Sequence, residues 1–357
     1  MPSYNILLMG ASYGSLLGSK LLFGGHSIHL VCLPAEADLI NAEGFSVRLP
    51  IRGRKDPVLL ESRKLPGKVT AGPATGVDPK QYDLVGLCMQ EPQYRSPGVR
   101  ELLDAVAKSR VPCMSIMNMP PLPYVKRIPG LDYKALEPAY TDPRVWDSFD
   151  PKTITLNSPD PQAIRPPDGK ANELLVTLPT NFKCARFEDD KSTQILRNLQ
   201  NDVEAARFDT PEGRIELPVK LKIYDSIFVP LAKWAMLLAG NYRCVTKDGM
   251  RTAQEAVHSD IETSRSVYNF VFDLCVKLGA DPRDLVPFEK YAAAAQSLVR
   301  PASAARALNN GMPNIERADK LVQLIAKQKG LTHPVIYAGV ALVDSRLEAN
   351  RKNAAAP

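Results

Sequence analysis

The sequence predicts a chain of two parts, a doubly wound parallel α/β sheet followed by an all-α domain. Strand and helix signals alternate along the first part of the chain, and such alternation is typical of parallel sheets. The first strand runs directly into a glycine turn and a helix. From residue 231 to residue 281 there is no proline, and apolar residues recur at i, i+3 and i+4. The length of 357 residues suits two domains of roughly 100–200 residues each.

Each element of the sheet domain has its own signal in the sequence. Short apolar runs predict buried parallel strands, and leucines at helical spacing predict the helices between them. Glycines mark where the first two helices end, at Gly24 and Gly44. The expected strands are 4–9, 26–33, 81–89 and 111–117, and the expected helices are 15–23, 35–43 and 99–108.

A proline-rich segment follows the predicted sheet. Residues 112–179 hold 13 of the 31 prolines, whereas about 5% proline is usual for a whole protein. Because proline removes a backbone donor, we expect loops here, with edge strands at 153–157 and 173–178. The stretch 120–175 is therefore an insertion that either elaborates the sheet edge or forms a lid over a site. In either case we expect it to shape substrate choice.

The remainder of the chain reads as helical. Amphipathic spacing predicts about five or six helices, one of them ending at Gly330. We assign residues 1–190 to a dinucleotide-binding domain and 191–347 to a helical domain for substrate binding and dimerisation. Residues 348–357 are polar and rich in alanine, and we expect them to be a frayed tail.

Composition and charge exclude several classes of protein. The net charge is +6, but no block of five or six like charges occurs, so no nucleic-acid partner is expected. The positive excess suits a small ligand that carries phosphate or carboxylate. The six cysteines include no C-x-x-C pair, which indicates a reduced, cytoplasmic protein. No signal peptide or membrane span is expected, because no apolar run reaches roughly 18 residues.

The glycine turn contains a candidate dinucleotide site, at Gly10, Ala11, Ser12, Tyr13 and Gly14. In the G-x-G-x-x-G fingerprint the backbone approaches a pyrophosphate that rests on the helix N-terminus. Here the second glycine is a serine and the third is displaced, so a plain strand-to-helix turn is the alternative. The end of the second strand has neither the acid that selects NAD nor the arginine that selects NADP. Glu36 lies nearby, and the choice of cofactor stays open.

Two further patterns contain polar residues that could bind a ligand or transfer a proton. Asn118 ends a central strand, where ligands bind in doubly wound sheets, although an Asx turn explains it equally well. Lys233 lies among apolar residues about two helical turns before Asn241. Burial would favour loss of its proton and suit it to proton transfer, and the alternative is a lysine that extends into solvent. No metal site is expected, because His26 and His29 point to opposite faces of a strand.

These features together resemble the ketopantoate reductase (2-dehydropantoate 2-reductase) family. The resemblance rests on the glycine turn, on the asparagine after the central strand, and on the K-x(7)-N pattern from Lys233 to Asn241. Residues 301–306 and 314–319 are similar to that family's S-S-M and E-I-D region. The resemblance implies a Rossmann domain, a helical domain like the C-terminal domain of 6-phosphogluconate dehydrogenase, a homodimer, and NADP(H) or NAD(H) as cofactor.

The resemblance also implies roles for individual residues. Lys233 would be the general acid, Asn118 would contact the nicotinamide ribose and the substrate, and Asn241 would orient the substrate. Ser303 would bind the substrate carboxylate, and the family's glutamate falls on Asn314 or Glu316. Departures are Gln90, in place of a lysine near the NADP phosphate, and Leu237, in place of a second asparagine. The leucine is expected to make the pocket more apolar.

These observations leave three functions open. The first is an NAD(P)-dependent oxidoreductase that reduces the carbonyl of a 2-oxo acid or a related small molecule. The second is a non-catalytic dinucleotide-binding redox sensor, which the altered glycine turn and the departures at Gln90 and Leu237 favour. The third is an opine- or polyol-type dehydrogenase with the same fold.

Overall fold

The computed structural model describes residues 3–166 and 168–355, which form two compact units. The first unit contains the chain up to Met89 together with Gln93–Met117 and Val145–Asp225. The second contains Gln90–Pro92, Asn118–Arg144 and the chain from Ser226 onward. The sheet-bearing unit thus extends past residue 190, and it does not include residues 118–144.

The first unit is built on a parallel sheet, as the sequence predicted. All neighbouring strands in it are parallel except β8 and β11, which are antiparallel. The first strand is an inner strand, with two strands on one side of it and five on the other. The eight strands are, in order, β14 (Leu221–Tyr224), β11 (Phe182–Ala185), β8 (Ile154–Ser158), β7 (Cys113–Ile116), β6 (Leu84–Leu87), β1 (Asn5–Met9), β2 (Ser27–Val31) and β5 (Val69–Gly72).

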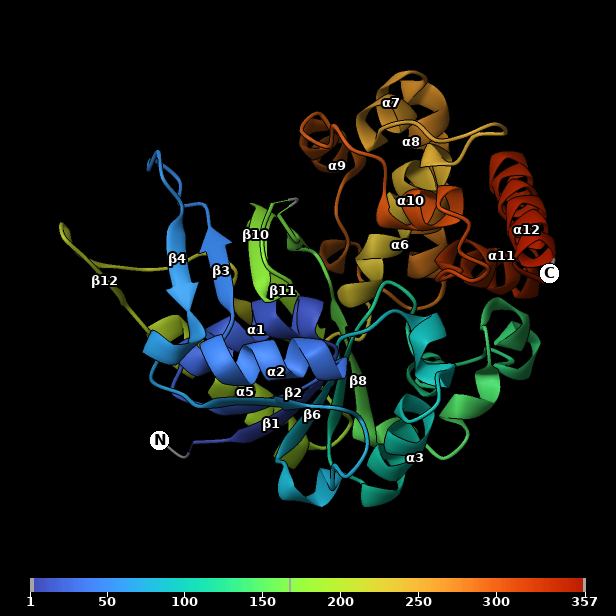
Figure 1. Ribbon diagram of the computed structural model, residues 1–357. Helices are drawn as coiled ribbons and strands as arrows, with labels where there is room; N and C mark the ends of the chain where they lie inside the picture. The colour runs from blue at the N-terminus through green and yellow to red at the C-terminus, as the bar shows by residue number, and fades with distance from the viewer. Residues whose placement is uncertain (1–2, 167, 356–357) are drawn as a thin grey trace. The chain divides into compact units, whose positions relative to one another are not determined.

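Helix α1 (Ala11–Phe23) packs between this sheet and a smaller one. It contacts β2 on one side and strands β3 and β10 on the other (Figure 1). The smaller sheet has the order β4 (Val58–Glu61), β3 (Ser46–Leu49), β10 (Glu173–Leu178) and β9 (Gln162–Ile164). Leu16 and Leu17 of α1 are fully buried in the resulting core. The other helices of this unit are α2 (Pro34–Glu43), α3 (Val99–Ser109) and α5 (Asp190–Ala205).

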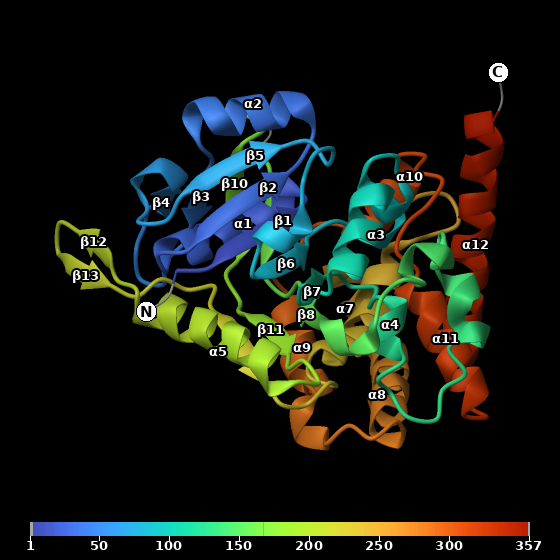
Figure 2. The ribbon, with the colours of Figure 1, turned by 90° about the horizontal axis from the view of Figure 1, so that it is seen from below.

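The predicted edge strands of the proline-rich segment are inner strands instead. Strand β8 lies between β7 and β11, and β10 lies between β3 and β9. The prediction fails because the prolines flank these two strands and do not occur within them, so every strand residue keeps its backbone donor. The hairpin of β12 (Phe208–Thr210) and β13 (Gly213–Ile215) follows α5 and projects from its end (Figure 2).

The second unit is largely helical, as predicted. Its described residues from 226 onward hold seven α-helices, more than the five or six expected, because residues 253–309 divide into several short ones. A five-residue π-helical turn, Leu237–Asn241, continues the first of them. The helices are α6 (Lys233–Met236), α7 (Ala253–His258), α8 (Ile261–Lys277), α9 (Phe288–Ala295), α10 (Ser303–Asn309), α11 (Ala318–Gln328) and α12 (Pro334–Ala355).

Residues 118–144 are a packed part of this second unit. They include the short helix α4 (Leu122–Val125) and the 3₁₀ helix η4 (Lys134–Ala139), which packs against α11. The Asp132 N–H donates to Gln328 Oε1 (2.9 Å), and Gln328 Nε2 donates to the Asp132 carbonyl (2.8 Å). Leu136 is fully buried. This half of the proline-rich segment is therefore neither an elaborated sheet edge nor a free-standing lid.

The chain also differs from the expected frayed tail at its C-terminal end. Helix α12 continues to Ala355, and residues 356–357 lie outside the described part. Lys352 pairs with Glu348 one turn earlier (2.7 Å), and Asn350 Nδ2 donates to the carbonyls of Leu308 and Met312. These contacts and the helix propensity of alanine hold the last turns in place.

The described residues contain neither a disulfide nor a helix that could span a membrane. Among them no disulfide joins any of the six cysteines. None of the helices in the described ranges combines the length and the apolar character that crossing a bilayer requires.

Candidate functional site

The turn after β1 has the geometry of an anion site. Gly10 has φ +111°, its N–H donates to the Val31 carbonyl (2.8 Å), and α1 begins at the very next residue. No side chain caps this helix, so its first N–H groups are available to a ligand. A Cβ on Gly10 would lie 2.5 Å from Met89 Cγ and 3.0 Å from the Cys88 carbonyl oxygen. The turn therefore requires glycine at position 10.

Gly14 performs the packing role of the last glycine in the fingerprint. A Cβ there would lie 3.0 Å from Leu30 Cδ2, so its absence lets α1 approach the sheet closely. Ser12 is exposed in the first turn of α1. The Tyr13 hydroxyl donates to the Pro161 carbonyl (3.2 Å), which connects the turn to the proline-rich segment.

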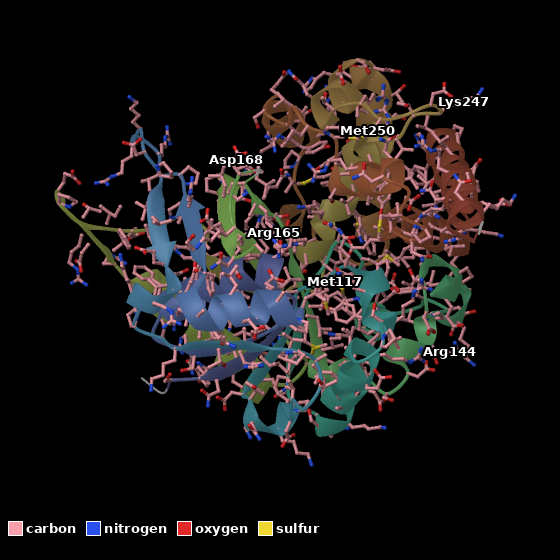
Figure 3. All side chains as sticks on the ribbon, in the orientation of Figure 1. Met117, Arg144, Arg165, Asp168, Lys247 and Met250 are labelled. Carbon is pink, nitrogen blue, oxygen red and sulfur yellow. The ribbon has the colours of Figure 1, made fainter. Side chains whose placement is uncertain are left out.

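An arginine that the sequence did not reveal lies beside the tip of β2. Arg165, labelled in Figure 3, follows β9 and forms an ion pair with Glu36 in the first turn of α2. An acid at this position suits the ribose 2′-hydroxyl of NAD, and an arginine suits the 2′-phosphate of NADP. The pair thus supplies both an acid and an arginine near the end of β2. Because residue 165 is 129 positions from residue 36, no local pattern in the sequence predicts this ion pair.

A small polar cavity in the second unit gathers most of the other predicted residues. Its volume is about 10 Å³, close to the space of one water molecule. Five polar residues singled out from five separate stretches of sequence lie around it. The lining residues are Gln90, Asn118, Leu237, Asn241, Tyr242, Ser303, Ala304, Ile315 and Glu316.

Local structure explains how these side chains reach the cavity. Asn118 comes directly after Met117, the residue labelled in Figure 3, at the end of the β7 segment. Asn241 closes the π-helical turn, a distortion that is frequent at functional sites. Ser303 is the first residue of α10, and Glu316 lies in the loop before α11. Each polar group therefore lies at the end of a regular element.

Glu316 is the carboxyl group of the cavity, and burial perturbs it strongly. Its side chain is buried and accepts hydrogen bonds from Asn118 Nδ2 (3.2 Å) and from the Glu91 N–H (3.4 Å). Burial raises the pKa of Glu316 to about 7, and the hydrogen bond from Asn118 opposes the rise only in part. The charge of Glu91 adds to the rise. The carboxyl of Glu316 thus keeps its proton to a higher pH than an ordinary carboxyl does.

Three residues that support Glu316 were not predicted. Glu91 is buried, and its carboxylate accepts from Thr141 N (3.0 Å) and Thr141 Oγ1 (2.8 Å). The Tyr242 hydroxyl donates to the Glu316 carbonyl (2.6 Å) and accepts from the Ala318 N–H (2.9 Å). Glu91 and Tyr242 directly follow the predicted residues Gln90 and Asn241, which was the one available signal. Thr141 comes from the proline-rich segment, where no pattern in the sequence predicts which side chains are buried.

Two predicted residues are not among the described residues that line this cavity. Lys233 is the first residue of α6 and is half-buried. The Asn314 side-chain oxygen accepts a hydrogen bond from Arg351 of α12 (3.2 Å), so of the pair Asn314 and Glu316 only Glu316 lines the cavity. Leu237 is buried in the cavity wall and gives it an apolar side. Within the described ranges no group of three or more His, Cys, Asp or Glu side chains can hold a metal ion.

Comparison with solved structures gives full-length matches. A protein assigned as a ketopantoate reductase from Ralstonia solanacearum aligns with a TM-score of 0.67 at 13% identity, over 98% of this chain and 99% of its own. The 2-dehydropantoate 2-reductase of Methylococcus capsulatus aligns with a TM-score of 0.63 at 15% identity, over 97% of both chains. D-mandelate dehydrogenase, solved with NADH and anilino(oxo)acetate, aligns with a TM-score of 0.63 at 13% identity, over 97% of this chain and 99% of its own.

The chain has the ketopantoate reductase fold. The resemblance inferred from the sequence is thus confirmed at the level of the fold, at 13–15% sequence identity. No protein-family model matches the chain, and no curated protein matches its sequence.

Proposed function

We propose that this protein is an NAD(P)H-dependent reductase of a 2-oxo acid or a closely related carbonyl compound. The observation that carries the proposal is the cavity in which Asn118, Asn241, Ser303 and Glu316 come together from four stretches of sequence. The shared fold supports it, because solved structures of that fold include 2-dehydropantoate 2-reductase and D-mandelate dehydrogenase.

The Gly10 turn is the proposed binding site of the dinucleotide. Ala11, Ser12 and Tyr13 would offer backbone N–H groups to its pyrophosphate, and Gly10 and Gly14 would allow the close approach. When bound, a reduced nicotinamide supplies hydride. Asn118 would contact the cofactor as well as the substrate, and Gln90 would contact the cofactor. The Glu36–Arg165 pair would govern NAD(H) against NADP(H).

The remaining residues would bind the substrate and move one proton. The Ser303 hydroxyl and the Asn118 amide would hold the substrate carboxylate, and Asn241 would orient the carbonyl. Lys233 would act as general acid and deliver a proton to the carbonyl oxygen as hydride reaches the carbon. Its positive charge favours the developing alkoxide. Leu237, Ala304 and Ile315 favour a substrate with an apolar group beside its 2-oxo acid.

Replacing Lys233 tests the assigned chemistry. In a Lys233→Ala variant, turnover of a panel of 2-oxo acids with NADH and NADPH should fall by about 10²–10⁴-fold, since a positioned general acid is lost. The matched control is Lys277→Ala, an exposed lysine of the same unit. Cofactor binding, measured by nicotinamide fluorescence, should stay unchanged in both. Unchanged turnover in Lys233→Ala would remove this residue from the mechanism.

Non-catalytic dinucleotide binding is the second candidate. Leu237 favours it, because a buried apolar group stands where the resemblance places a hydrogen-bonding asparagine. A thermal shift with NADH or NADPH, without oxidation of either by any carbonyl compound of the panel, would support a redox sensor. The opine- and polyol-type alternative would appear as turnover with those substrates instead.

A further inference from the structure

A second, larger cavity lies in the helical unit and has no role in the proposed reaction. Its volume is about 220 Å³, below the about 300–1,000 Å³ of sites for drug-sized ligands. Apolar residues make most of its wall, and Arg243, Arg251 and Asp319 are the charged ones. The full lining is Leu238, Tyr242, Arg243, Val245, Arg251, Val267, Asp319, Val335, Ile336, Ala338, Gly339, Val340 and Leu342.

Helix α12 supplies one wall of this cavity. Four of its lining residues follow helical spacing at i, i+3, i+4 and i+7, and thus form a single stripe. Gly339 stands within the stripe, and a Cβ added to it would meet no atom within 4 Å. The stripe consists of Val335, Ala338, Gly339 and Leu342. The space beside α12 is therefore open enough to accept an alkyl chain.

The charged wall carries an excess of positive charge. Arg243 and Arg251 are half-buried neighbours, since Arg251 Nε donates to the Arg243 carbonyl (2.9 Å). Their other hydrogen bonds go to neutral oxygens, those of Ala239 and Ser264 for Arg243 and that of Ser259 for Arg251 (3.2 Å). Within the described part of the chain, no carboxylate lies at ion-pair distance from either guanidinium.

The acids near these arginines already have other partners. Asp319, which lines the cavity, pairs with the buried Arg317 (2.9 Å). Asp260 accepts from Thr263 N (3.0 Å) at the start of α8, and Glu255 accepts from Thr252 N (2.8 Å) at the start of α7. The charge of Asp260 acts on both arginines, but neither forms an ion pair with it, so an anion entering the cavity would meet two guanidinium groups with no carboxylate in contact.

The two cavities share a wall. Leu237 and Asn241 of the π-helical turn line the small polar cavity, and Leu238 of the same turn lines the large one. The next residue, Tyr242, lines both cavities. The Tyr242 hydroxyl binds the Glu316 carbonyl. A ligand in the large cavity would thus contact the residue that supports Glu316.

We propose that the large cavity binds a small apolar monocarboxylate, with its alkyl chain along α12 and its carboxylate at Arg243 and Arg251. The apolar stripe accounts for the chain, and the two arginines account for the negative charge. The proposal does not rest on the reductase function, because it follows from the helical unit alone.

Calorimetric titration of the full chain tests this site with three probes of equal chain length. Hexanoate should bind, hexanol should bind at least about tenfold more weakly, and hexylamine should not bind, because charge-assisted hydrogen bonds to the arginines are lost. Arg251→Gln should weaken hexanoate binding about tenfold or more. Gly339→Leu, which fills the open space without changing charge, should abolish it. The control Arg300→Gln removes an exposed arginine and should have no effect.

A second set of variants separates this site from the small cavity. Ser303→Ala should leave hexanoate binding unchanged, because Ser303 lines only the small cavity. Loss of binding in Ser303→Ala with full binding in Gly339→Leu would overturn the proposal and assign hexanoate to the small cavity. Equal binding of hexanoate and hexanol would overturn the role of the arginines. A dimer that does not bind hexanoate and that Gly339→Leu converts to monomer, seen by sedimentation, would show that a second copy covers the cavity.

Discussion

At the scale of single residues, Glu316 is the buried carboxyl group of the candidate site. Its carboxyl accepts hydrogen bonds from a side chain and from a backbone N–H, and it lies near the buried carboxylate of Glu91. A neutral Glu316 can donate a hydrogen bond to a substrate oxygen, whereas a charged one cannot. The protonation state of this single carboxyl therefore affects the stability of the fold and, under the proposed function, the binding of substrate.

The raised pKa of Glu316 gives a prediction with a definite sign. Its folded pKa of about 7 exceeds its ordinary value of 4.5, so stability is lost as pH rises from 4.5 through 7. Glu316→Gln removes this loss and should stabilise the protein at pH 8 by up to about 3 kcal/mol, with little effect at pH 4.5. Urea unfolding at both pH values measures the difference. An exposed control, Glu262→Gln, should show no such dependence, and a gain that is equal at both pH values would refute the assignment.

At the scale of elements, the unit of strand, glycine and helix at the N-terminus carries the cofactor proposal. One residue, Gly10, separates β1 from α1, so the chain reverses its direction without a loop. The turn is tight because the Gly10 N–H bonds to β2, and because Met89 and Cys88 fill the space where a side chain would be. The first N–H groups of α1 are thus held in one orientation relative to the sheet.

A pair of glycine variants tests this unit. Gly10→Ala introduces both an unfavourable positive φ and a clash, so it should destabilise the protein and abolish the thermal shift given by NADH or NADPH. Gly25→Ala is the matched control, because Gly25 also has positive φ (+90°) but nothing lies within 4 Å of its added Cβ. The control should lose less stability and keep cofactor binding. Retained binding in Gly10→Ala would argue that the turn holds no dinucleotide.

At the scale of the whole molecule, the proline-rich segment is divided between the two units. Residues 118–144 belong to the helical unit, and the rest of the segment adds strands to both sheets of the first unit. Its prolines flank the strands and occur within the short helices α4 and η4, and these helices also contain buried side chains such as Tyr124 and Leu136. The segment thus contributes to the core. Its expected influence on substrate choice remains a prediction, and Thr141 and Asn118 are the residues of the segment through which we expect that influence.

Truncating a buried side chain of the segment distinguishes core from lid. Leu136→Ala should cost about 2–5 kcal/mol of the free energy of unfolding, because it opens a cavity beneath η4 where that helix packs against α11. The exposed neighbour Lys134 provides the control, and Lys134→Ala should stay within about 0.5 kcal/mol. Chemical unfolding measures both. A loss as small as that of the control would indicate that residues 118–144 form a loosely attached lid.

The sequence by itself determined the elements whose signals are local. Apolar runs, helical periodicity and Gly10 predicted the parallel sheet, the first turn and the helical half, because each depends on residues within about one or two turns of one another. The resemblance also singled out Asn118, Asn241 and Ser303 before their positions in space were known. Their roles in chemistry stay predictions.

Only the tertiary structure decided which distant groups meet. Thr141 is 50 residues from Glu91, and Arg165 is 129 residues from Glu36, and no local pattern encodes such contacts. Strands β8 and β10 became inner strands because pairing with partners far along the chain outweighed the effect of the prolines beside them. Burial, which raises the pKa of Glu316 and leaves Arg243 and Arg251 facing an apolar cavity, arises in the same way from packing between elements that are far apart in sequence.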